Sequence, residues 1–307
     1  MSVSSEPRAP AALQPPLLDR LGAQLPKLVL APTFAVSLFF VYGFIGWTAW
    51  LSLSKSRLLP NYDWAGLSQY VRLFENHRWW VAAENLFIFG GLFIAFAMVI
   101  GLILAIFLDQ RIRVEGAIRT IYLYPMALSL IVTGVVWQWM LNPDLGLTSV
   151  MHSLGFSGFQ FDWIIDRNMA IYAIVIAAVW QASGFVMALF LAGLRGVDDA
   201  VFKAAQVDGA SLPRIYWRIV IPSLRPVFFS ALIILAHIAI KSFDLIKAMT
   251  NGGPGYSTDV PATFMYTFAY TRGQLGMGAA AAMMMLMAVL ALIIPYLYSE
   301  LRGGRNG

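Results

Sequence analysis

Long stretches without a charged side chain alternate with polar segments along this chain, and they predict its membrane crossings. Five runs free of Asp, Glu, Lys, Arg and His hold 24 to 27 residues each, at 28–54, 85–108, 120–143, 168–194 and 273–299. About 20 apolar residues suffice to cross a hydrocarbon core roughly 30 Å thick, so each run predicts one transmembrane helix. A sixth span, at about 227–249, is interrupted by His237, Lys241, Asp244 and Lys247. The pattern therefore predicts an all-α polytopic membrane protein with six transmembrane helices.

The segments outside these spans differ in length and composition. Residues 1–27 are rich in Pro and Ala and carry charges of both signs, which predicts a disordered tail. The apolar run that follows is longer than the core of about 7–15 residues in a signal peptide, so we expect a retained first helix. The uncharged run 260–271 is too short to cross and predicts an interfacial or re-entrant helix. The membrane domain then covers 28–300, and 301–307 form a second tail.

The distribution of Lys and Arg predicts which side of the membrane each segment faces. Six spans place both termini on one side. If that side is the cytoplasm, 13 Lys and Arg lie inside and six outside, as the positive-inside rule favours. Four of the outer six fall between the first two spans and weaken this assignment without reversing it: Lys55, Arg57, Arg72 and Arg78. We expect a multi-pass protein of the cell inner membrane with cytoplasmic termini.

Composition supports a membrane protein and argues against other classes. Apolar residues make up 59% of the chain and charged residues 12%, against roughly 25% charged in soluble domains. The net charge of +5 would suit a nucleic-acid partner, but the cations lie in short loops that set orientation, so we expect no nucleic acid. The sequence has no cysteine, no clustered histidines and no GxxxxGK(S/T) phosphate loop. We therefore predict a non-catalytic subunit without metal or cofactor, which cannot hold ATP on its own.

A polar segment of 31 residues, 195–225, separates two of the spans and carries five cations. Unpaired backbone groups are costly in hydrocarbon, so the segment must meet water or another protein, and its cations place it in the cytoplasm. Helix connections usually have about 2–8 residues, which favours a functional loop over a mere connector. Residues 201–207 predict a short helix, Gly209 a turn, and Ser211 with Pro213 the start of a second helix.

This segment resembles the EAA signature of ABC importer permeases. The Ala204-Ala205 pair, the Gly209 that follows it and the Ile219-x-x-Pro222 run stand at the spacing of that signature. The resemblance implies a coupling loop, 195–226, that docks on a separate ATPase. The implied coupling residues are Lys203, Ala204, Ala205, Asp208, Gly209, Ala210, Pro213 and Pro222.

One position departs from the family pattern. Lys203 stands where the family has the Glu that names the motif. In the family that Glu is linked to a basic residue of the ATPase, so with Lys203 the contact is absent or made differently. Asp198 or Asp199 could supply an anion nearby.

Other parts of the chain resemble the carbohydrate-uptake branch of the same family, the maltose-type permeases. The resemblance is carried by Asn85, 119–139, Trp180, 192–194, Phe243-Asp244-Leu245 and 250–255. It covers about 28–300, and the general look is closest to glucose/mannose permeases. It implies import of a sugar, a monosaccharide such as glucose, that an external sugar-binding protein delivers. It also implies a second permease subunit and two ATP-binding subunits as partners in the lipid bilayer.

Ionisable residues inside the sixth span are candidates for the sugar path. Lys241 and Asp244 are three apart on one predicted helical face. A charge near the bilayer centre costs at least about 2.5–3.5 kcal/mol, so both must face a protein interior or a wet cavity. Two interpretations stay open: an ion pair that fastens helices, or a polar wall where Asp244 accepts hydrogen bonds from sugar hydroxyls.

Polar and aromatic residues of other segments complete the candidate path. Trp180 beside Gln181 suits the apolar face and hydroxyl edge of a sugar, but packing alone also explains it. Tyr266 and Tyr270 share one face of the short helix with the same two interpretations. The full candidate path is Asn85, Trp180, Gln181, Lys241, Asp244, Tyr266 and Tyr270. Four tryptophans near span ends fit the aromatic belts of membrane interfaces: Trp79, Trp80, Trp137 and Trp139.

A secondary transporter of a small polar solute, working without an ATPase, is the main alternative. It calls for inverted repeats and broken helices in both halves of the chain, whereas the intramembrane charges cluster in one span. A membrane-embedded enzyme is a third possibility, but the sequence has no convergent acid–base or metal set. Solute uptake that needs a separate ATPase would distinguish the importer from both.

Overall fold

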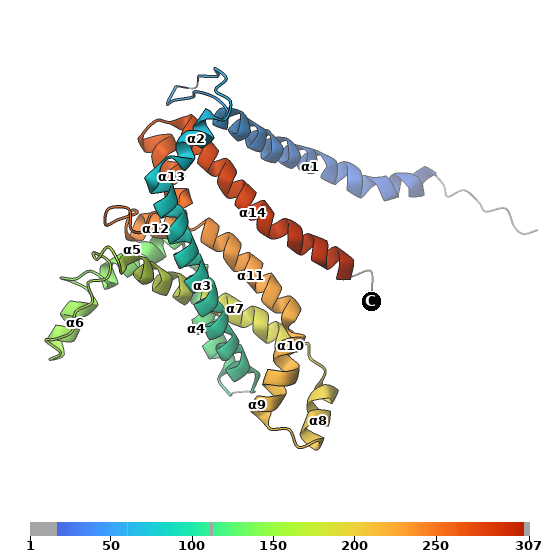
Figure 1. Cartoon of the computed structure of the whole chain (residues 1–307). Helices are drawn as coiled ribbons and strands as arrows, with labels where there is room; N and C mark the ends of the chain where they lie inside the picture. Colours follow the sequence, from blue (N-terminus) through green and yellow to red (C-terminus); the bar gives the residue numbers. More distant parts are fainter. Residues whose placement is uncertain (1–16, 60, 111–112, 304–307) are drawn as a thin grey trace, which may run out of the picture. The chain divides into compact units, whose positions relative to one another are not determined.

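The computed structural model describes residues 17–59, 61–110 and 113–303, and these residues are helical with no β-strand among them (Figure 1). They fall into two units, which are divided between Trp50 and Leu51. The helices are α1 Leu17–Ser52, α2 Ser68–Phe74, α3 His77–Asp109, α4 Glu115–Ala127, α5 Leu130–Met140, α6 Leu147–Ser153, α7 Ala170–Leu194, α8 Asp199–Val207, α9 Leu212–Ile215, η1 Tyr216–Val220, α10 Ile221–Ser223, α11 Arg225–Ile240, α12 Phe243–Met249, α13 Pro261–Tyr266, η2 Thr267–Thr271 and α14 Leu275–Gly303.

Four of the described helices are long and apolar enough to cross a membrane: Val29–Ser52 within α1, all of α3, all of α7, and Leu275–Tyr296 within α14. The number rises to six if each of two bent helix pairs counts as one span. One pair is α4 with α5, bent by 100°, and the other joins Leu212–Ser223 to α11 at 65°. The all-α polytopic architecture is confirmed, with crossings that are less regular than the charge-free runs predict.

Two expected spans are broken rather than continuous. In the run 120–143, Leu128 and Ser129 have extended backbones (ψ 143° and 140°), so the chain turns sharply between α4 and α5. In the run 227–249, α11 ends at Ile240 and α12 begins at Phe243. A run without charges reports that a segment is apolar, and it carries no information about where its helix breaks.

Helix ends also differ from the expected boundaries. The first helix begins at Leu17, so the prediction of a disordered tail is wrong for residues 17–27, while 1–16 lie outside the described residues. The last helix continues to Gly303. The short helix expected over 260–271 is confirmed as α13 followed by η2.

The core of the second unit is the contact between α3 and α7, to which α4 and α11 add. Most of α7 is buried, and small residues on its inner side let neighbouring backbones come close. A Cβ built on Gly101 of α3 would lie 2.6 Å from Cγ1 of Val186, and one on Gly184 of α7 would lie 1.7 Å from the carbonyl oxygen of Tyr122. Close backbone packing of this kind is how helices associate in membranes, where burial of apolar surface gives little driving force.

A second, smaller core joins α2, the start of α3, α13, η2 and the start of α14. Trp79 belongs to this core, with 6% of its surface exposed and its ring 5.3 Å from that of Phe264. The expected role of Trp79 in an interfacial belt is therefore wrong, because its side chain faces protein. Trp80, the next residue on the helix, is 54% exposed.

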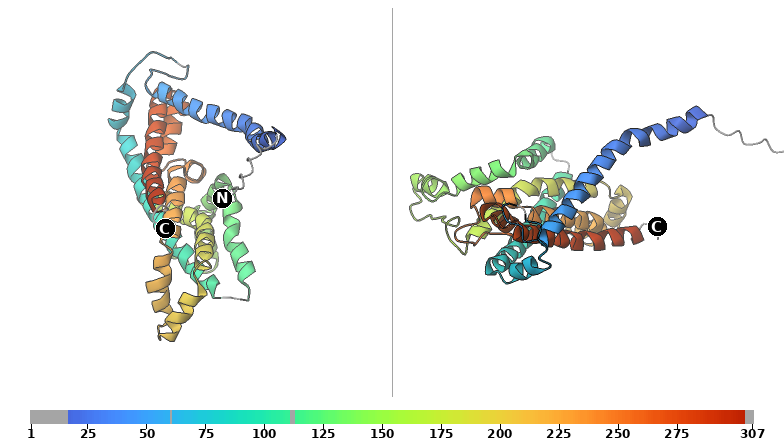
Figure 2. Two further views of the ribbon diagram at one scale, coloured as in Figure 1. Left: turned by 90° about the vertical axis from the view of Figure 1, so that its right-hand side faces the viewer. Right: turned by 90° about the horizontal axis from the view of Figure 1, so that it is seen from above.

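Helices α8 and α9 and the smaller core lie at opposite ends of the second unit. Figures 1 and 2 show α8 and α9 at one end, and α2 with α13 at the other. The long helix α3 runs between these ends, beginning beside α2 and finishing near α9 (Figure 1).

Gly184→Ala should lower the melting temperature of the purified protein. The new Cβ would overlap the Tyr122 carbonyl oxygen, which belongs to the backbone and cannot turn aside, and overpacking of this kind costs about 1–3 kcal/mol. Gly91→Ala is the matched control, because a Cβ there meets nothing within 4 Å. Equal melting temperatures for the two variants would show that α4 does not rest on α7 at this position.

Candidate functional site

The polar segment after α7 folds as a small helical hairpin. The Asp198 carboxylate accepts a hydrogen bond from the backbone N–H of Ala200 (2.8 Å) and caps α8. After α8 the chain turns at Gly209, whose φ of +75° is a conformation that glycine adopts most easily. Ser211 then precedes α9, with Pro213 in its first turn. The predicted helix, turn and second helix are confirmed, but the Ser211 side chain makes no capping hydrogen bond to the second helix.

The outer surface of this hairpin is exposed and largely without internal partners. The exposed residues include five of the predicted coupling set: Lys203, Ala204, Asp208, Gly209 and Pro213. Ala204 is exposed and Ala205 is buried, so the two residues of the Ala-Ala pair face in different directions. Ala210 is half-buried. Pro222 is exposed on α10. Apolar side chains extend the same surface, with Val207 88% and Trp217 75% exposed. An exposed surface that mixes apolar residues and cations suits a protein partner.

Lys203 makes no ion pair among the described residues, whose two ion pairs are Arg78–Asp259 and Arg195–Glu115. The carboxylate of Asp198 is engaged at the N-terminus of α8, and the side chain of Asp199 lies outside the description. The anion expected near Lys203 therefore has no counterpart among the described ion pairs.

Tyr216 ties the hairpin to the end of α3. Its hydroxyl donates to Oδ2 of Asp109 (2.7 Å) and accepts from Nε2 of Gln110 (2.8 Å). Its ring also meets that of Phe202 on α8, with centroids 5.9 Å apart. Burial and the Asp109 carboxylate raise the pKa of Tyr216 from 10 to about 12, so the hydroxyl remains a donor at neutral pH. Sequence reasoning missed this contact, although Asp109 is the first charge after a long apolar run.

One of the predicted path residues, Gln181, contacts the break between α4 and α5. Gln181 of α7 donates its amide N–H to the carbonyl oxygen of Leu128 (3.0 Å), where α4 ends. A cavity of about 210 Å³ adjoins this break and also touches Ser242 at the second break. Gln181 thus supplies a partner for backbone that the broken helix leaves open.

Trp180 lines a larger cavity of about 860 Å³ with other aromatic side chains. Its ring lies 5.8 Å from that of Trp137 at an angle of 68° and is 41% exposed. The aromatic residues of this cavity are Phe96, Tyr122, Trp137, Trp163, Tyr172 and Trp180. Flat rings around a space of this size can stack on the apolar face of a sugar.

Lys241 and Asp244 lie at the second break and not on one helical face. Lys241 follows the end of α11, whereas Asp244 is in the first turn of α12. Both are exposed, and they form no ion pair with one another. The premise that they share a continuous helix is wrong, because α11 ends at Ile240. The aromatic residues Tyr266 and Tyr270 lie close by, since the ring of Tyr266 is 4.9 Å from Phe243 and 5.3 Å from Tyr270.

Asn85 holds the loop between α12 and α13. Its amide nitrogen donates to the backbone carbonyls of Tyr256 (3.1 Å) and Asp259 (2.9 Å). Both hydrogens of the amide are used in this way, so Asn85 fixes the position of this loop, and its side-chain oxygen is the group left to accept a further hydrogen bond.

A buried ion pair that the sequence did not reveal fastens the same loop. Asp259 is 1% exposed and accepts from Nε of Arg78 (2.6 Å) and from the Thr263 hydroxyl (2.5 Å). The Arg78 guanidinium also lies 4.3 Å from the ring centre of Tyr256. These contacts and those of Asn85 connect the start of α3 to the loop 250–259, which we call the outer loop.

Comparison with known proteins identifies the family. Residues 97–301 match the family described as binding-protein-dependent transport system inner membrane component. The chain is also 37% identical over 288 residues to a probable ABC transporter permease protein of Pyrococcus horikoshii, which covers 92% of this chain and 99% of that protein. The chain belongs to this family.

Two further comparisons agree with this membership. The permease is 37% identical over 268 residues to the xylose/arabinose import permease protein XacH of Haloferax volcanii, covering 86% of this chain and 84% of that protein. A crystal structure of a bacterial ABC transporter that imports the acidic polysaccharide alginate has the same fold, with a TM-score of 0.80 and 22% identity over 93% of this chain and 98% of that one. The expected resemblance to ABC importer permeases is confirmed, and the permease is a multi-pass inner membrane protein.

Asp259→Asn should destabilise the permease by up to about 3–5 kcal/mol, the range for stranding one partner of a buried ion pair. Arg78, of which 15% of the side chain is exposed, would keep its charge and lose its carboxylate. Thermal unfolding of the detergent-purified permease measures the effect, and Asp63→Asn, an exposed carboxylate without an ion pair, is the control. The double change Arg78→Met with Asp259→Leu should recover most of the loss. A melting temperature for Asp259→Asn like that of Asp63→Asn would contradict the role of the pair.

Proposed function

We propose that this chain is the membrane-spanning permease subunit of an ABC importer that takes up a sugar, a monosaccharide such as glucose. An external solute-binding protein delivers the sugar. The exposed hairpin of α8 and α9 is the observation that carries this proposal, because it presents a rigid surface at one end of a membrane unit. Support for a sugar comes from the relative named for xylose and arabinose import and from the aromatic cavity around Trp180.

The proposed partners are a second permease subunit, two ATP-binding subunits and the external binding protein. The family description itself names dependence on a binding protein. ATP hydrolysis belongs to the ATP-binding subunits, so this subunit is not an enzyme. Both termini and the hairpin are cytoplasmic in this proposal, which places the outer loop on the external side.

Coupling proceeds through the contacts that join the hairpin to the membrane helices. Closure of the ATP-binding subunits moves the surface that contains Lys203 and Gly209. The movement passes through the ring contact of Phe202 with Tyr216 and the hydrogen bond of Tyr216 to Asp109. From there α3 carries it into the contact with α7.

The proposed sugar path uses the cavities beside the two helix breaks. Trp180 offers a ring to the apolar face of the sugar, and Gln181 lies at the α4–α5 break. At the second break Asp244 is exposed and free of an ion pair, so its carboxylate can accept hydrogen bonds from hydroxyl groups. Lys241, Tyr266 and Tyr270 complete this side of the path, and Asn85 positions the outer loop above it.

A secondary transporter is the alternative, and the structure supplies one feature that such a protein would need. Broken helices occur in both halves of the described chain, at α4–α5 and α11–α12. The membership of a binding-protein-dependent family does not favour this alternative. Broken helices also suit an importer whose path passes between helix ends.

Uptake into proteoliposomes tests the function. The permease is purified with its co-expressed partner subunits and reconstituted, and radiolabelled glucose is supplied with the binding protein outside and ATP inside. Uptake should require both ATP and the binding protein, and unlabelled monosaccharides should compete better than maltose. Uptake by the permease alone, driven by an ion gradient, would support the secondary transporter instead. Competition by maltose alone would remove the monosaccharide assignment.

Gly209→Asp should uncouple transport while leaving the fold intact. A Cβ at this position meets nothing within 4 Å, and Asp and Asn are the non-glycine residues that adopt a positive φ most readily. The added charge would enter the partner's cleft, so substrate-stimulated ATP hydrolysis should fall at least about tenfold, which corresponds to roughly 1.4 kcal/mol. Gly209→Asn is the matched control with the same shape and no charge, and it should lose far less. Full activity of Gly209→Asp in the reconstituted complex would exclude the turn as the docking contact.

A further inference from the structure

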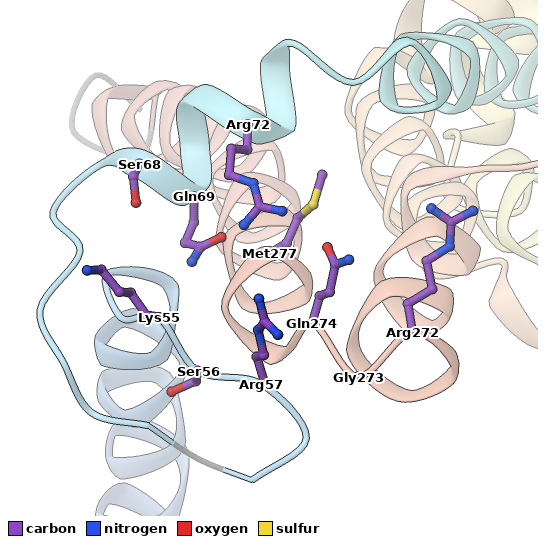
Figure 3. Close-up of a pocket in the computed structure, with 10 residues that line it drawn as sticks. All are labelled: Lys55, Ser56, Arg57, Ser68, Gln69, Arg72, Arg272, Gly273, Gln274 and Met277. Carbon is purple, nitrogen blue, oxygen red and sulfur yellow. The ribbon is translucent and has the colours of Figure 1, made fainter.

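Four cations surround one pocket at the end of the second unit that is opposite the hairpin. The pocket has a volume of about 390 Å³ and takes Lys55 and Arg57 from the loop after α1, Arg72 from α2 and Arg272 from the end of η2 (Figure 3). Its other lining residues are Ser56, Ser68, Gln69, Gly273, Gln274 and Met277. We call it the cationic pocket. Neither the coupling surface nor the proposed sugar path uses these side chains.

No carboxylate lines the cationic pocket, and the two ion pairs of the described residues lie elsewhere. Arg57 and Arg72 extend toward each other from opposite sides of the pocket (Figure 3). The guanidinium of Arg272 lies 4.5 Å from the ring centre of Phe268 and points away from Arg57 and Arg72 (Figure 3). Like charges that converge as those of Arg57 and Arg72 do repel each other unless an anion lies between them. Guanidinium groups bind carboxylate and phosphate oxygens in pairs of parallel hydrogen bonds, so the geometry suits an oxyanion.

The floor of the pocket is fixed in place. The side-chain amide of Gln69, 5% exposed, donates to the carbonyl oxygen of Ser54 (2.9 Å). The backbone N–H of Gly276 donates to the carbonyl oxygen of Ser56 (2.9 Å). These bonds join α2, the loop after α1 and the start of α14. The cations therefore extend from a scaffold that exists before any ligand binds.

Exposed apolar side chains flank the cationic residues along the chain, which points to a membrane surface. α2 buries Gln69 and Leu73 and exposes Val71 and Phe74. Exposed apolar or aromatic side chains continue on both sides of it, at Leu58, Leu59, Leu67 and Trp80. Immediately after the pocket begins α14, one of the helices that can cross a membrane. Cations beside exposed apolar and aromatic side chains at the end of such a helix are typical of the headgroup region of a bilayer.

We propose that the cationic pocket binds the phosphate of an anionic phospholipid headgroup, with Arg57 and Arg72 as its two principal ligands. Lys55 and Arg272 add positive charge at the edge, and the exposed side chains of α2 contact the acyl region. An acidic side chain of an external protein would satisfy the same cations. The exposed apolar side chains next to these cations in the sequence, among them Leu58, Leu59 and Val71, favour the lipid.

Lipid binding to the full-length permease tests the proposal. The detergent-purified protein is delipidated and titrated with phosphatidylglycerol, and bound lipid is counted by native mass spectrometry. Phosphatidylcholine, whose headgroup carries no net charge, is the lipid control. We expect saturable phosphatidylglycerol binding that weakens at least about tenfold in the double variant Arg57→Gln with Arg72→Gln, because charge-assisted hydrogen bonds to the phosphate are lost. Arg167→Gln, which removes a cation outside the pocket, should bind like the unchanged protein.

The remaining outcomes also decide the question. Equal affinity in the double variant and in Arg167→Gln would overturn the proposal, as would equal binding of phosphatidylcholine. Displacement of the lipid by millimolar inorganic phosphate would show a free-anion site and would overturn the assignment to lipid. If the double variant fails to fold, Arg57→Lys with Arg72→Lys keeps the charge but loses the paired geometry, and it should show an intermediate affinity. A variant that binds lipid normally but loses stimulation by the external binding protein would assign the pocket to that protein.

Discussion

A helix that breaks inside an apolar layer leaves backbone carbonyl and N–H groups without partners, and the second unit is organised around this constraint. The extended residues after α4 leave the carbonyl of Leu128 without a helical partner. The side-chain amide of Gln181, on the buried helix α7, donates a hydrogen bond to it. At the second break the hydroxyl of Ser242 bonds to the carbonyl of Ala239 (2.7 Å). Once such partners are in place, a break becomes a place where polar groups can lie next to a cavity. Of the predicted path residues, Gln181 bonds to the first break from the intact helix α7, and Lys241 and Asp244 lie at the second break.

Polar contacts between distant segments concentrate at the two ends of the unit, and apolar close packing occupies its middle. At one end Arg78 and Asn85 bind the outer loop, and at the other Asp109 and Gln110 bind Tyr216. Between them, α3 meets α7 through residues such as Gly101. The surrounding medium explains this division. In hydrocarbon every polar group needs a hydrogen-bond partner from the protein, whereas near the ends of the unit water can bind the groups that have none.

Features that depend on local pattern could be predicted from the sequence. The runs 85–108, 168–194 and 273–299 lie within or largely coincide with long helices, and the α8 helix with its turn at Gly209 lies where the segment 201–209 indicated. Features that depend on distant contacts could not. Arg78 and Asp259 are 181 positions apart, so nothing near either residue predicts the pair. Trp79 and Trp80 look alike in sequence, yet adjacent positions on a helix point in directions about 100° apart, and only one of them faces the core.

The helix α3 contains 33 residues and no proline, so at about 1.5 Å per residue it is a rod of roughly 50 Å, clearly longer than a hydrocarbon core. Its first turn contains Arg78, which binds the outer loop, and its last residue is Asp109, which binds the hairpin. A lever of that length magnifies small rotations, because a tilt of about 10° carries one tip roughly 9 Å relative to the other. In the proposed coupling, this single helix connects the hairpin directly to the outer loop, and its close contact with α7 at Gly101 lies between the two.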